Sequence, residues 1–271
     1  MPVNSNRFNK FLGLFWVCIG FISTSFAAVP QLSSEQQGWL ADLIFANECN
    51  RQLDCLSHWN NGENFPSMGI GHFIWYQQDQ QEIFEETFPQ LLEYLWVSNV
   101  ELPVWLTPPL QANNPWPDQA SFNAAKNTQR MEELRILLAN TMGLQAQFIA
   151  NRLNDTLGEI VASFPNEEQD EIQLLIERLS NSASPLGVYA LIDYLHFKGS
   201  GLKEAERYQQ QGWGLRQVLA QMDANNATLE SYVAAATEVL ETRVRNAPAA
   251  RNEQRWLRGW INRLHTYLPG N

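Results

Sequence analysis

Two glutamate residues near the start of the sequence lie in contrasting surroundings that suit acid–base chemistry. Glu48 follows the apolar run 43–46, whereas Glu63 follows the turn-forming pair Asn61-Gly62. An apolar setting raises the pKa of a carboxyl group, and a polar turn leaves a carboxylate ionised. Cleavage of a glycosidic bond needs one acid to protonate the leaving oxygen and a second group to stabilise or attack the developing cation. The pattern therefore predicts a raised pKa for Glu48 and makes Glu63 its candidate partner.

Further groups with chemical potential follow at short spacing. Ser67 offers a hydroxyl that could hold a water molecule, and Gly69 and Gly71 allow close backbone approach in a tight hairpin. The Gly-Ile-Gly segment lacks the third glycine and the preceding strand of a nucleotide-binding fingerprint. His72 is either a substrate-binding residue or a hydrogen-bonded core histidine, and both interpretations stay open.

Aromatic side chains flank the same segment. Trp75 and Tyr76 follow it directly, and Trp213 lies between two glycines later in the chain. Aromatic faces can stack on sugar rings, but they also fill protein cores. We predict substrate-binding roles for Trp75, Tyr76 and Trp213, with core packing as the alternative.

The order of these residues resembles the phage-type lysozymes of the lysozyme-like superfamily. In that family a catalytic Glu ends the first long helix, a β-hairpin carries an acidic residue, and a hydroxyl residue precedes Gly-Ile-Gly-His. Glu48 takes the Glu position, and Ser67 stands where the family usually has Thr. The family's Asp would fall near Asn61, two residues before Glu63. Glu48 precedes His72 by 24 residues, a longer interval than usual, which predicts a longer loop.

The C-terminal third is also similar to this family. Residues 189–199 are similar to the central helix of the larger lobe, and the Arg-rich segment 243–265 with Trp256 and Trp260 is similar to the closing helices. Residues 80–185 find no counterpart. The specific resemblance covers about 25 residues, with weaker support over about 80 more.

The resemblance implies an α+β, mainly α, lysozyme-like fold with a small β-hairpin lobe and a larger helical lobe. It implies cleavage of β-1,4-linked amino-sugar polymers, peptidoglycan first, without a cofactor. Glu48 would be the general acid, Glu63 would hold the attacking water or steady the cation, and Ser67 would help to place the water. If Glu63 does not reach the site, a lytic transglycosylase, which needs one Glu, is the alternative.

Three other functions stay open. An acidic cleft would suit a chitosanase acting on a cationic polymer. A non-catalytic glycan-binding or scaffolding protein would need the cleft of the same fold but not the acids. An interaction protein would be built on residues 120–180.

Hydrophobic periodicity predicts the elements that must position these residues. One lysozyme-like domain is expected over 28–271, with a Pro-rich connection at 103–117 and a helical insertion at about 118–183. The final helix carries a stripe, including Trp256 and Trp260, that is typical of a core-facing surface. The expected helices span residues 33–49, 82–96, 120–179 with a break near 164–166, 186–197, 215–222, 229–244 and 253–268, and short strands are expected within 65–76.

The N-terminus has the features of a secretory signal peptide over residues 1–27. Arg7 and Lys10 precede an apolar stretch at 11–22, and small residues lead to Ala27. This stretch is shorter than the ~20 apolar residues of a spanning helix. We expect a periplasmic or secreted protein with no stable membrane insertion after cleavage, and a retained N-terminal anchor is the alternative.

Charge and cysteines limit the partners further. The net charge of −11 argues against nucleic acid, because affinity for phosphate backbones comes from Lys and Arg. The Arg-rich segment 243–265 is either a solvated helix face or a basic wall that faces an anionic ligand. In an oxidising compartment, Cys49 and Cys55 suggest one local disulfide, with two buried thiols as the alternative. No metal site is predicted, because no Cys or His pair lies nearby at zinc-like spacing.

Overall fold

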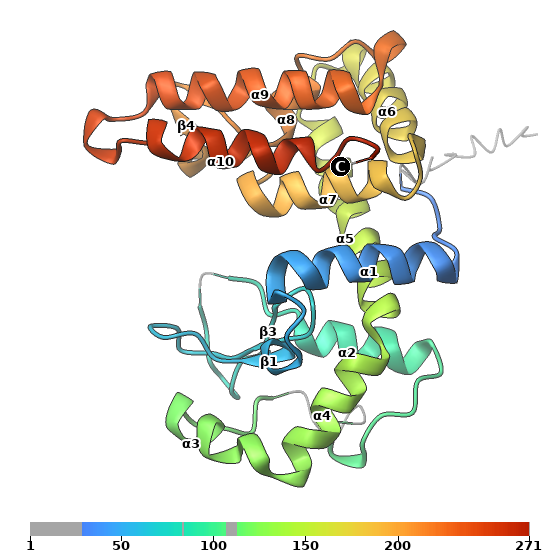
Figure 1. Ribbon diagram of the computed structural model, residues 1–271, viewed down its shortest axis with the longest axis vertical. Coiled ribbons are helices and arrows are strands. Elements are labelled where there is room, and N and C mark those ends of the chain that lie inside the picture. The colour runs from blue at the N-terminus through green and yellow to red at the C-terminus, as the bar shows by residue number, and fades with distance from the viewer. Residues whose placement is uncertain (1–28, 83, 107–112, 271) are drawn as a thin grey trace, which may run out of the picture.

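The computed structural model describes residues 29–82, 84–106 and 113–270. The signal peptide predicted for 1–27 lies outside the described residues. The described chain is mainly helical, with one three-stranded and one two-stranded antiparallel sheet, which confirms the prediction of a mainly α, α+β protein. It forms two lobes, one above the other in Figure 1. None of the helices in these ranges is long and apolar enough to cross a membrane.

The first lobe, blue to green in Figure 1, contains the three-stranded sheet and the N-terminal helices. Its sheet has the strand order β1-β2-β3, with Ser57 opposite Met68 and Ser67 opposite Ile74. Its elements are α1 (Ser34–Cys49), η1 (Leu53–Leu56), β1 (Ser57–His58), β2 (Ser67–Met68), β3 (Phe73–Ile74), α2 (Phe88–Val97), η2 (Val104–Leu106), α3 (Gln119–Ala124), η3 (Ala125–Asn127) and α4 (Gln129–Asn140).

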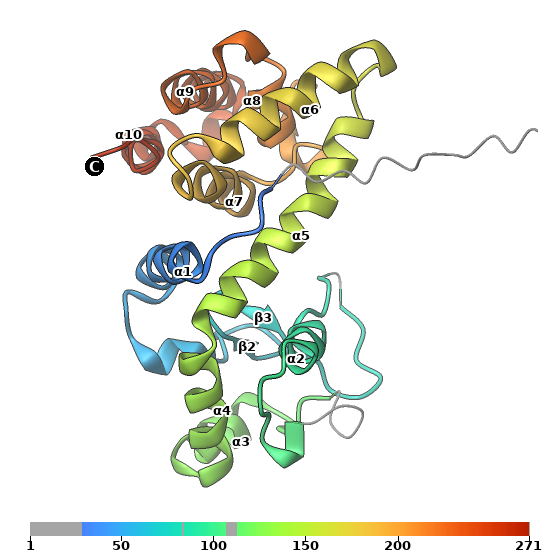
Figure 2. The same cartoon turned by 90° about the vertical axis from the view of Figure 1, so that its right-hand side faces the viewer.

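Helix α5 (Met142–Ala162) runs diagonally from the first lobe to the second, as Figure 2 shows. Its residues Leu153, Leu157 and Ile160 are buried in the common core. Segment 118–183 therefore contributes to the core that holds the two lobes together. The second lobe comprises α6 (Asn166–Asn181), α7 (Leu186–Lys198), η4 (Glu204–Glu206), β4 (Arg207–Tyr208), β5 (Gln211–Gly212), α8 (Leu215–Leu219), η5 (Ala224–Asn226), α9 (Leu229–Asn246), η6 (Ala249–Arg251) and α10 (Gln254–His265).

Local sequence signals fix both ends of α1. The backbone N–H of Gln36 donates to the Ser33 side chain at 3.3 Å, and the Ser33 N–H donates back to the Gln36 side chain at 2.9 Å. This is the capping box that opens a helix. The helix ends at Asn50, whose φ of 50° is left-handed. Because Glu48 lies in the last turn, its side chain leaves α1 at the junction of the two lobes.

Two glycines are required by the close approach of the β2–β3 turn to α5. Gly69 has a φ of 69°, and a Cβ there would overlap the side-chain oxygen of Gln145. At Gly71, a Cβ would come within 2.6 Å of the Phe73 ring. Gln145 is fully buried and accepts a hydrogen bond from the Ile70 N–H at 3.0 Å. The predicted tight hairpin is therefore present, and Gln145 joins it to α5.

Helix α2 begins at Phe88, later than the predicted residue 82. The two residues before it bond to strand β3 and its successor: the Ile74 N–H donates to Thr87 Oγ1 at 3.1 Å, and the Tyr76 N–H donates to Glu86 Oε1 at 2.6 Å. Side chains that hydrogen-bond to backbone groups elsewhere in this way compete with helix formation.

The predicted core-facing stripe of the last helix is wrong in part. In α10 only Leu264 is buried, and Trp256 is 39% exposed. The helix packs beside α9 and projects with it beyond the rest of the lobe, so that one side lacks neighbours (Figure 1).

Candidate active site

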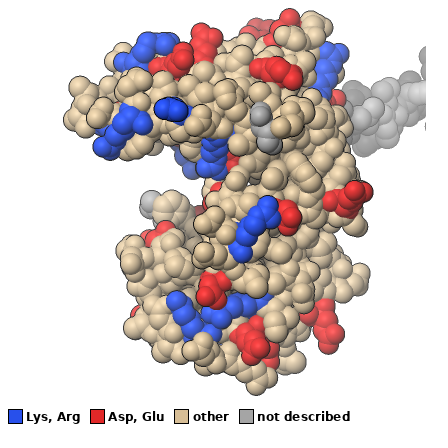
Figure 3. All heavy atoms as spheres, viewed as in Figure 1, with Lys and Arg blue, Asp and Glu red and all other residues tan. Residues whose placement is uncertain are grey.

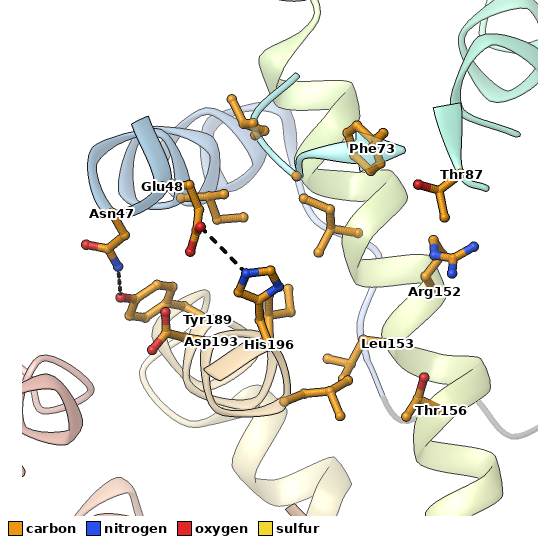
Figure 4. Close-up of a pocket in the computed structure, with 16 residues that line it drawn as sticks. Asn47, Glu48, Phe73, Thr87, Arg152, Leu153, Thr156, Tyr189, Asp193 and His196 are labelled. Atoms are coloured by element: carbon orange, nitrogen blue, oxygen red, sulfur yellow. Dashed lines mark hydrogen bonds and ion pairs between the residues drawn. The ribbon is translucent and has the colours of Figure 1, made fainter. Parts of the chain in front are cut away.

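Glu48 borders a pocket between the lobes. Its side chain is 21% exposed, and the pocket has a volume of about 310 Å³. The walls come from the end of α1, the β2–β3 turn, α5 and α7 (Figure 4). Figure 3 shows a deep notch between the lobes on the face where α1 and α7 end, with basic side chains along its upper edge. Glu48 is therefore neither sealed inside the core nor free in solvent.

Three basic side chains surround the Glu48 carboxylate. His196 Nε2 lies 3.6 Å from Oε2, His72 Nδ1 lies 3.8 Å from Oε2, and Arg263 Nη2 lies 3.7 Å from Oε1. They come from α7, from the turn before β3 and from α10. Basic side chains from both lobes therefore interact with the same Glu48 carboxylate.

This arrangement overturns the prediction of a raised pKa for Glu48. The neighbouring His196 imidazole, followed by the charges of His72 and Arg263, outweighs the effect of burial and lowers the pKa of Glu48. The same carboxylate raises the pKa of His196. Burial lowers the pKa of His72 in spite of Glu48. In the free protein at neutral pH, Glu48 is therefore an ionised carboxylate.

A second carboxylate in the pocket, Asp193, is fully engaged. Arg263 donates to its two oxygens at 2.7 and 2.8 Å, and the Tyr267 hydroxyl donates at 2.6 Å. Its side chain is 5% exposed. Charge-assisted bidentate bonds of this kind fix the guanidinium plane. Asp193 therefore orients Arg263 toward Glu48 and has no oxygen free to act as a nucleophile.

The part of the pocket away from Glu48 is largely apolar. Arg152 lies at the opposite wall, where Glu85 pairs with it at 2.7 Å and Gln90 accepts from it at 2.7 Å (Figure 4). A ligand in the pocket would therefore contact charged side chains at both ends, near Glu48 and near Arg152, and apolar side chains between them. The apolar side chains are Ile44, Ile70, Phe73, Ile149, Leu153, Ile192 and Leu195.

The structure does not bring the predicted partners Glu63 and Ser67 into this pocket. Glu63 borders a separate depression beside α3, and its carboxylate accepts a hydrogen bond from Asn60 at 3.0 Å. Ser67 is 5% exposed within strand β2. Of the three predicted catalytic residues, only Glu48 lines the pocket; His72, predicted to bind substrate, lies beside Glu48 but is not itself among the lining residues.

The aromatic residues predicted to bind substrate are buried. Trp75 is inaccessible and packs against Phe88 with ring centroids 4.7 Å apart. Tyr76 is 5% exposed and donates from its hydroxyl to the Phe84 carbonyl. Trp213 is 6% exposed and packs against Tyr208, with ring centroids 4.5 Å apart and the ring planes tilted by 51°. Their rings fill cores, so the alternative interpretation holds for all three.

The predicted disulfide between Cys49 and Cys55 is present, with Cα atoms 5.4 Å apart. It closes the loop after α1 and places Cys55 Sγ 3.6 Å from His72 Nε2. The atoms of these three residues that can bind metals lie within 4.8 Å of one another, but the disulfide occupies both sulfurs. In this state the bridge supports the His72 side of the site.

Sequence reasoning missed His196, Arg263 and Asp193 as site residues. Tyr189, Asp193 and His196 are four and three residues apart, a spacing that places them on one face of a helix, and this signal was available. The Tyr189 hydroxyl accepts from Asn47 at 2.6 Å (Figure 4).

At least three arginines of the basic segment 243–265 form ion pairs within the fold. Arg243 and Arg251 bind the buried Glu253 at 2.8 and 2.9 Å, whereas Arg263 binds Asp193 at 2.7 Å and lies 3.7 Å from Glu48.

No protein-family model, curated protein or solved structure matches this chain.

Proposed function

We propose that this protein is an exported, lysozyme-like enzyme that cleaves β-1,4-linked amino-sugar polymers, peptidoglycan first, with Glu48 as the general acid. The observation that carries the proposal is the position of Glu48. A partly buried carboxyl at the end of the first long helix borders an open pocket between two lobes, beside the Gly-Ile-Gly-His turn. The pocket volume of about 310 Å³ is within the range of small-molecule sites.

The placement of the acids favours a reaction with one carboxyl group. Glu63 does not line the pocket, and Asp193 is held by Arg263 and Tyr267. Glu48 would protonate the bridging oxygen, and its carboxylate would then take a proton from the attacking hydroxyl. If that hydroxyl belongs to the sugar itself, the product carries an anhydro end, as in a lytic transglycosylase.

The charges around the pocket favour an N-acetylated sugar over chitosan. A free amine of chitosan is cationic, and the carboxylates that line the pocket, Glu48 and Asp193, already face His196 and Arg263, so the amine would meet no unpaired carboxylate among the lining residues. Burial of a charge without a partner is costly. An acetyl methyl group, in contrast, matches the apolar wall.

A glycan-binding protein without catalysis is the second candidate. The lowered pKa of Glu48 favours it, because an ionised carboxylate accepts hydrogen bonds from sugar hydroxyls but cannot donate a proton. The same pocket and the same saccharide would then give binding without product.

Substitution of Glu48 separates the two candidates. Glu48→Gln should bind peptidoglycan but release no soluble fragments from it. Glu35→Gln, which removes an exposed carboxyl from the first turn of the same helix, is the matched control and should cleave at the rate of the unmodified protein. Clearing of a peptidoglycan suspension by Glu48→Gln at the control rate would exclude Glu48 as the acid.

A further inference from the structure

We propose that His196 holds the catalytic proton of Glu48 in the free protein and returns it to the Glu48 carboxylate when a saccharide fills the pocket. The inference rests on the proposed function, and it extends it by assigning a role to a residue that touches Glu48 rather than the scissile bond. His196 is in this sense a positioning residue.

The geometry places His196 between Glu48 and the open pocket. It lies in the last turn of α7, its Nε2 is 3.6 Å from Glu48 Oε2, and its side chain is 57% exposed. Figure 4 shows both side chains directed toward each other across the gap between α1 and α7. No other histidine is among the residues that line this pocket.

The charges that face His196 keep one proton on the pair. Glu48 on α1 and Asp193 on its own helix favour the imidazolium, whereas Arg263 on α10 disfavours it. His72 is a further titratable group on the other side of the Glu48 carboxylate, and the two histidines disfavour each other's charge. The result is a raised pKa for His196 and a lowered pKa for Glu48, so the shared proton lies on His196 Nε2.

A bound saccharide changes the balance within the pair. An ion pair this exposed depends on water for part of its stability, and a sugar that covers it removes that water. The neutral pair becomes favoured: the Nε2–H bond of His196 breaks and an O–H bond forms on Glu48, with no change in total charge. Substrate binding would thus create the acid form that the free protein lacks.

The proton returns at the end of the reaction. Glu48 gives it to the bridging oxygen as the bond from that oxygen to the anomeric carbon breaks. The hydroxyl that attacks the anomeric carbon, from water or from the sugar, releases one proton to Glu48. When the product leaves and water enters, this proton moves to His196 Nε2. The cycle consumes no other acid or base.

The proposal predicts a distinct pH profile. With His196 present, kcat/KM should stay high until the Glu48–His196 pair loses its shared proton. This happens at a pH above 6.5, the ordinary pKa of an imidazole, because the pKa of His196 is raised. In His196→Gln, Glu48 must take its proton from solvent, and His72 and Arg263 still lower the pKa of its carboxyl group. Since ordinary imidazole and carboxyl groups differ in pKa by about 2 units, the alkaline limb should move down by about this much, and kcat/KM at pH 7 should fall roughly 100-fold.

The experiment compares pH profiles of peptidoglycan cleavage for the unmodified protein, His196→Gln and His265→Gln, an exposed histidine on α10. A lower alkaline limb in His196→Gln alone supports the proposal, since a loss of structure would lower activity at every pH. An unchanged limb in His196→Gln overturns it and leaves the role of Glu48 standing. If the unmodified protein produces no fragments at any pH, the proposed function fails and the proposal fails with it.

A second measurement needs no variant. The ¹⁵N resonances of the His196 ring in the whole protein distinguish imidazolium from neutral imidazole. Near pH 6, saturation with tri-N-acetylchitotriose should convert the imidazolium pattern to the neutral one. An imidazolium that persists in the saturated complex contradicts the proton transfer.

Discussion

Replacement of Gln145 by Leu tests whether α5 holds the turn beside the active site in place. Gln145 is fully buried, accepts from the Ile70 N–H at 3.0 Å, and donates to the Leu138 carbonyl at 2.7 Å and to Thr141 Oγ1 at 3.0 Å. Leucine is similar in size but makes none of these bonds. The substitution therefore removes polar partners without opening a large cavity.

The expected loss of stability follows from the groups left behind. The buried Ile70 N–H loses its partner, which costs about 1–3 kcal/mol. The Leu138 carbonyl loses one bond, worth about 1 kcal/mol. Thr141 keeps its own bond to the Leu137 carbonyl at 2.8 Å, so it adds little. We expect Gln145→Leu to lower the free energy of unfolding by about 2–4 kcal/mol, a large share of a typical total of about 5–15 kcal/mol.

Urea unfolding at fixed pH, with the disulfide intact, measures this loss. Gln129→Leu is the control, because Gln129 is exposed at the start of α4, and it should change stability by less than about 0.5 kcal/mol. If Gln145→Leu is as stable as the control, the turn does not depend on Gln145. The explanation given for the Gly69–Gly71 geometry would then be wrong.

Three further predictions concern the site. Glu48, with its lowered pKa, adds stability above about pH 4.5 and loses it as the pH falls, whereas His196, with its raised pKa, adds stability below about pH 6.5 and loses it as the pH rises. Urea unfolding should therefore show that Glu48→Gln lowers the free energy of unfolding most between about pH 4.5 and pH 6.5, by about 0.5–1 kcal/mol for so exposed a pair. A loss of stability that does not change with pH would contradict the ion pair. Thiol titration of the unreduced, denatured protein should find neither Cys49 nor Cys55 free, and two reactive thiols would disprove the bridge. Glu63→Gln should keep the rate of peptidoglycan cleavage within about twofold, and a loss comparable to that of Glu48→Gln would show that Glu63 reaches the substrate.

Features that depend on neighbours in sequence could be predicted. The Ser33 cap and the Asn50 end of α1 follow from local hydrogen bonds. The antiparallel pairing of β2 with β3 across a short turn and the short loop closed by Cys49 and Cys55 are also local. These features were sufficient to place Glu48 at a helix end beside a hairpin.

Features that depend on distant parts of the chain could not be predicted. The sign of the pKa shift of Glu48 is set by His196 and Arg263, which fold back from the second lobe. A tryptophan such as Trp75 or Trp213 can either fill a core or bind a ligand at the surface. Only its packing in the folded protein shows which, and both are buried. Glu63 has the right chemistry, but the turn that carries it faces another depression.

The central claim is that Glu48 delivers a proton to a sugar-bridging oxygen. Mass spectrometry of the products from purified peptidoglycan, incubated in parallel with the protein and with Glu48→Gln, tests it most directly. We predict soluble fragments with new anhydro or reducing ends from the protein and none from the variant. Intact glycan in both incubations, or identical fragments in both, would contradict the claim.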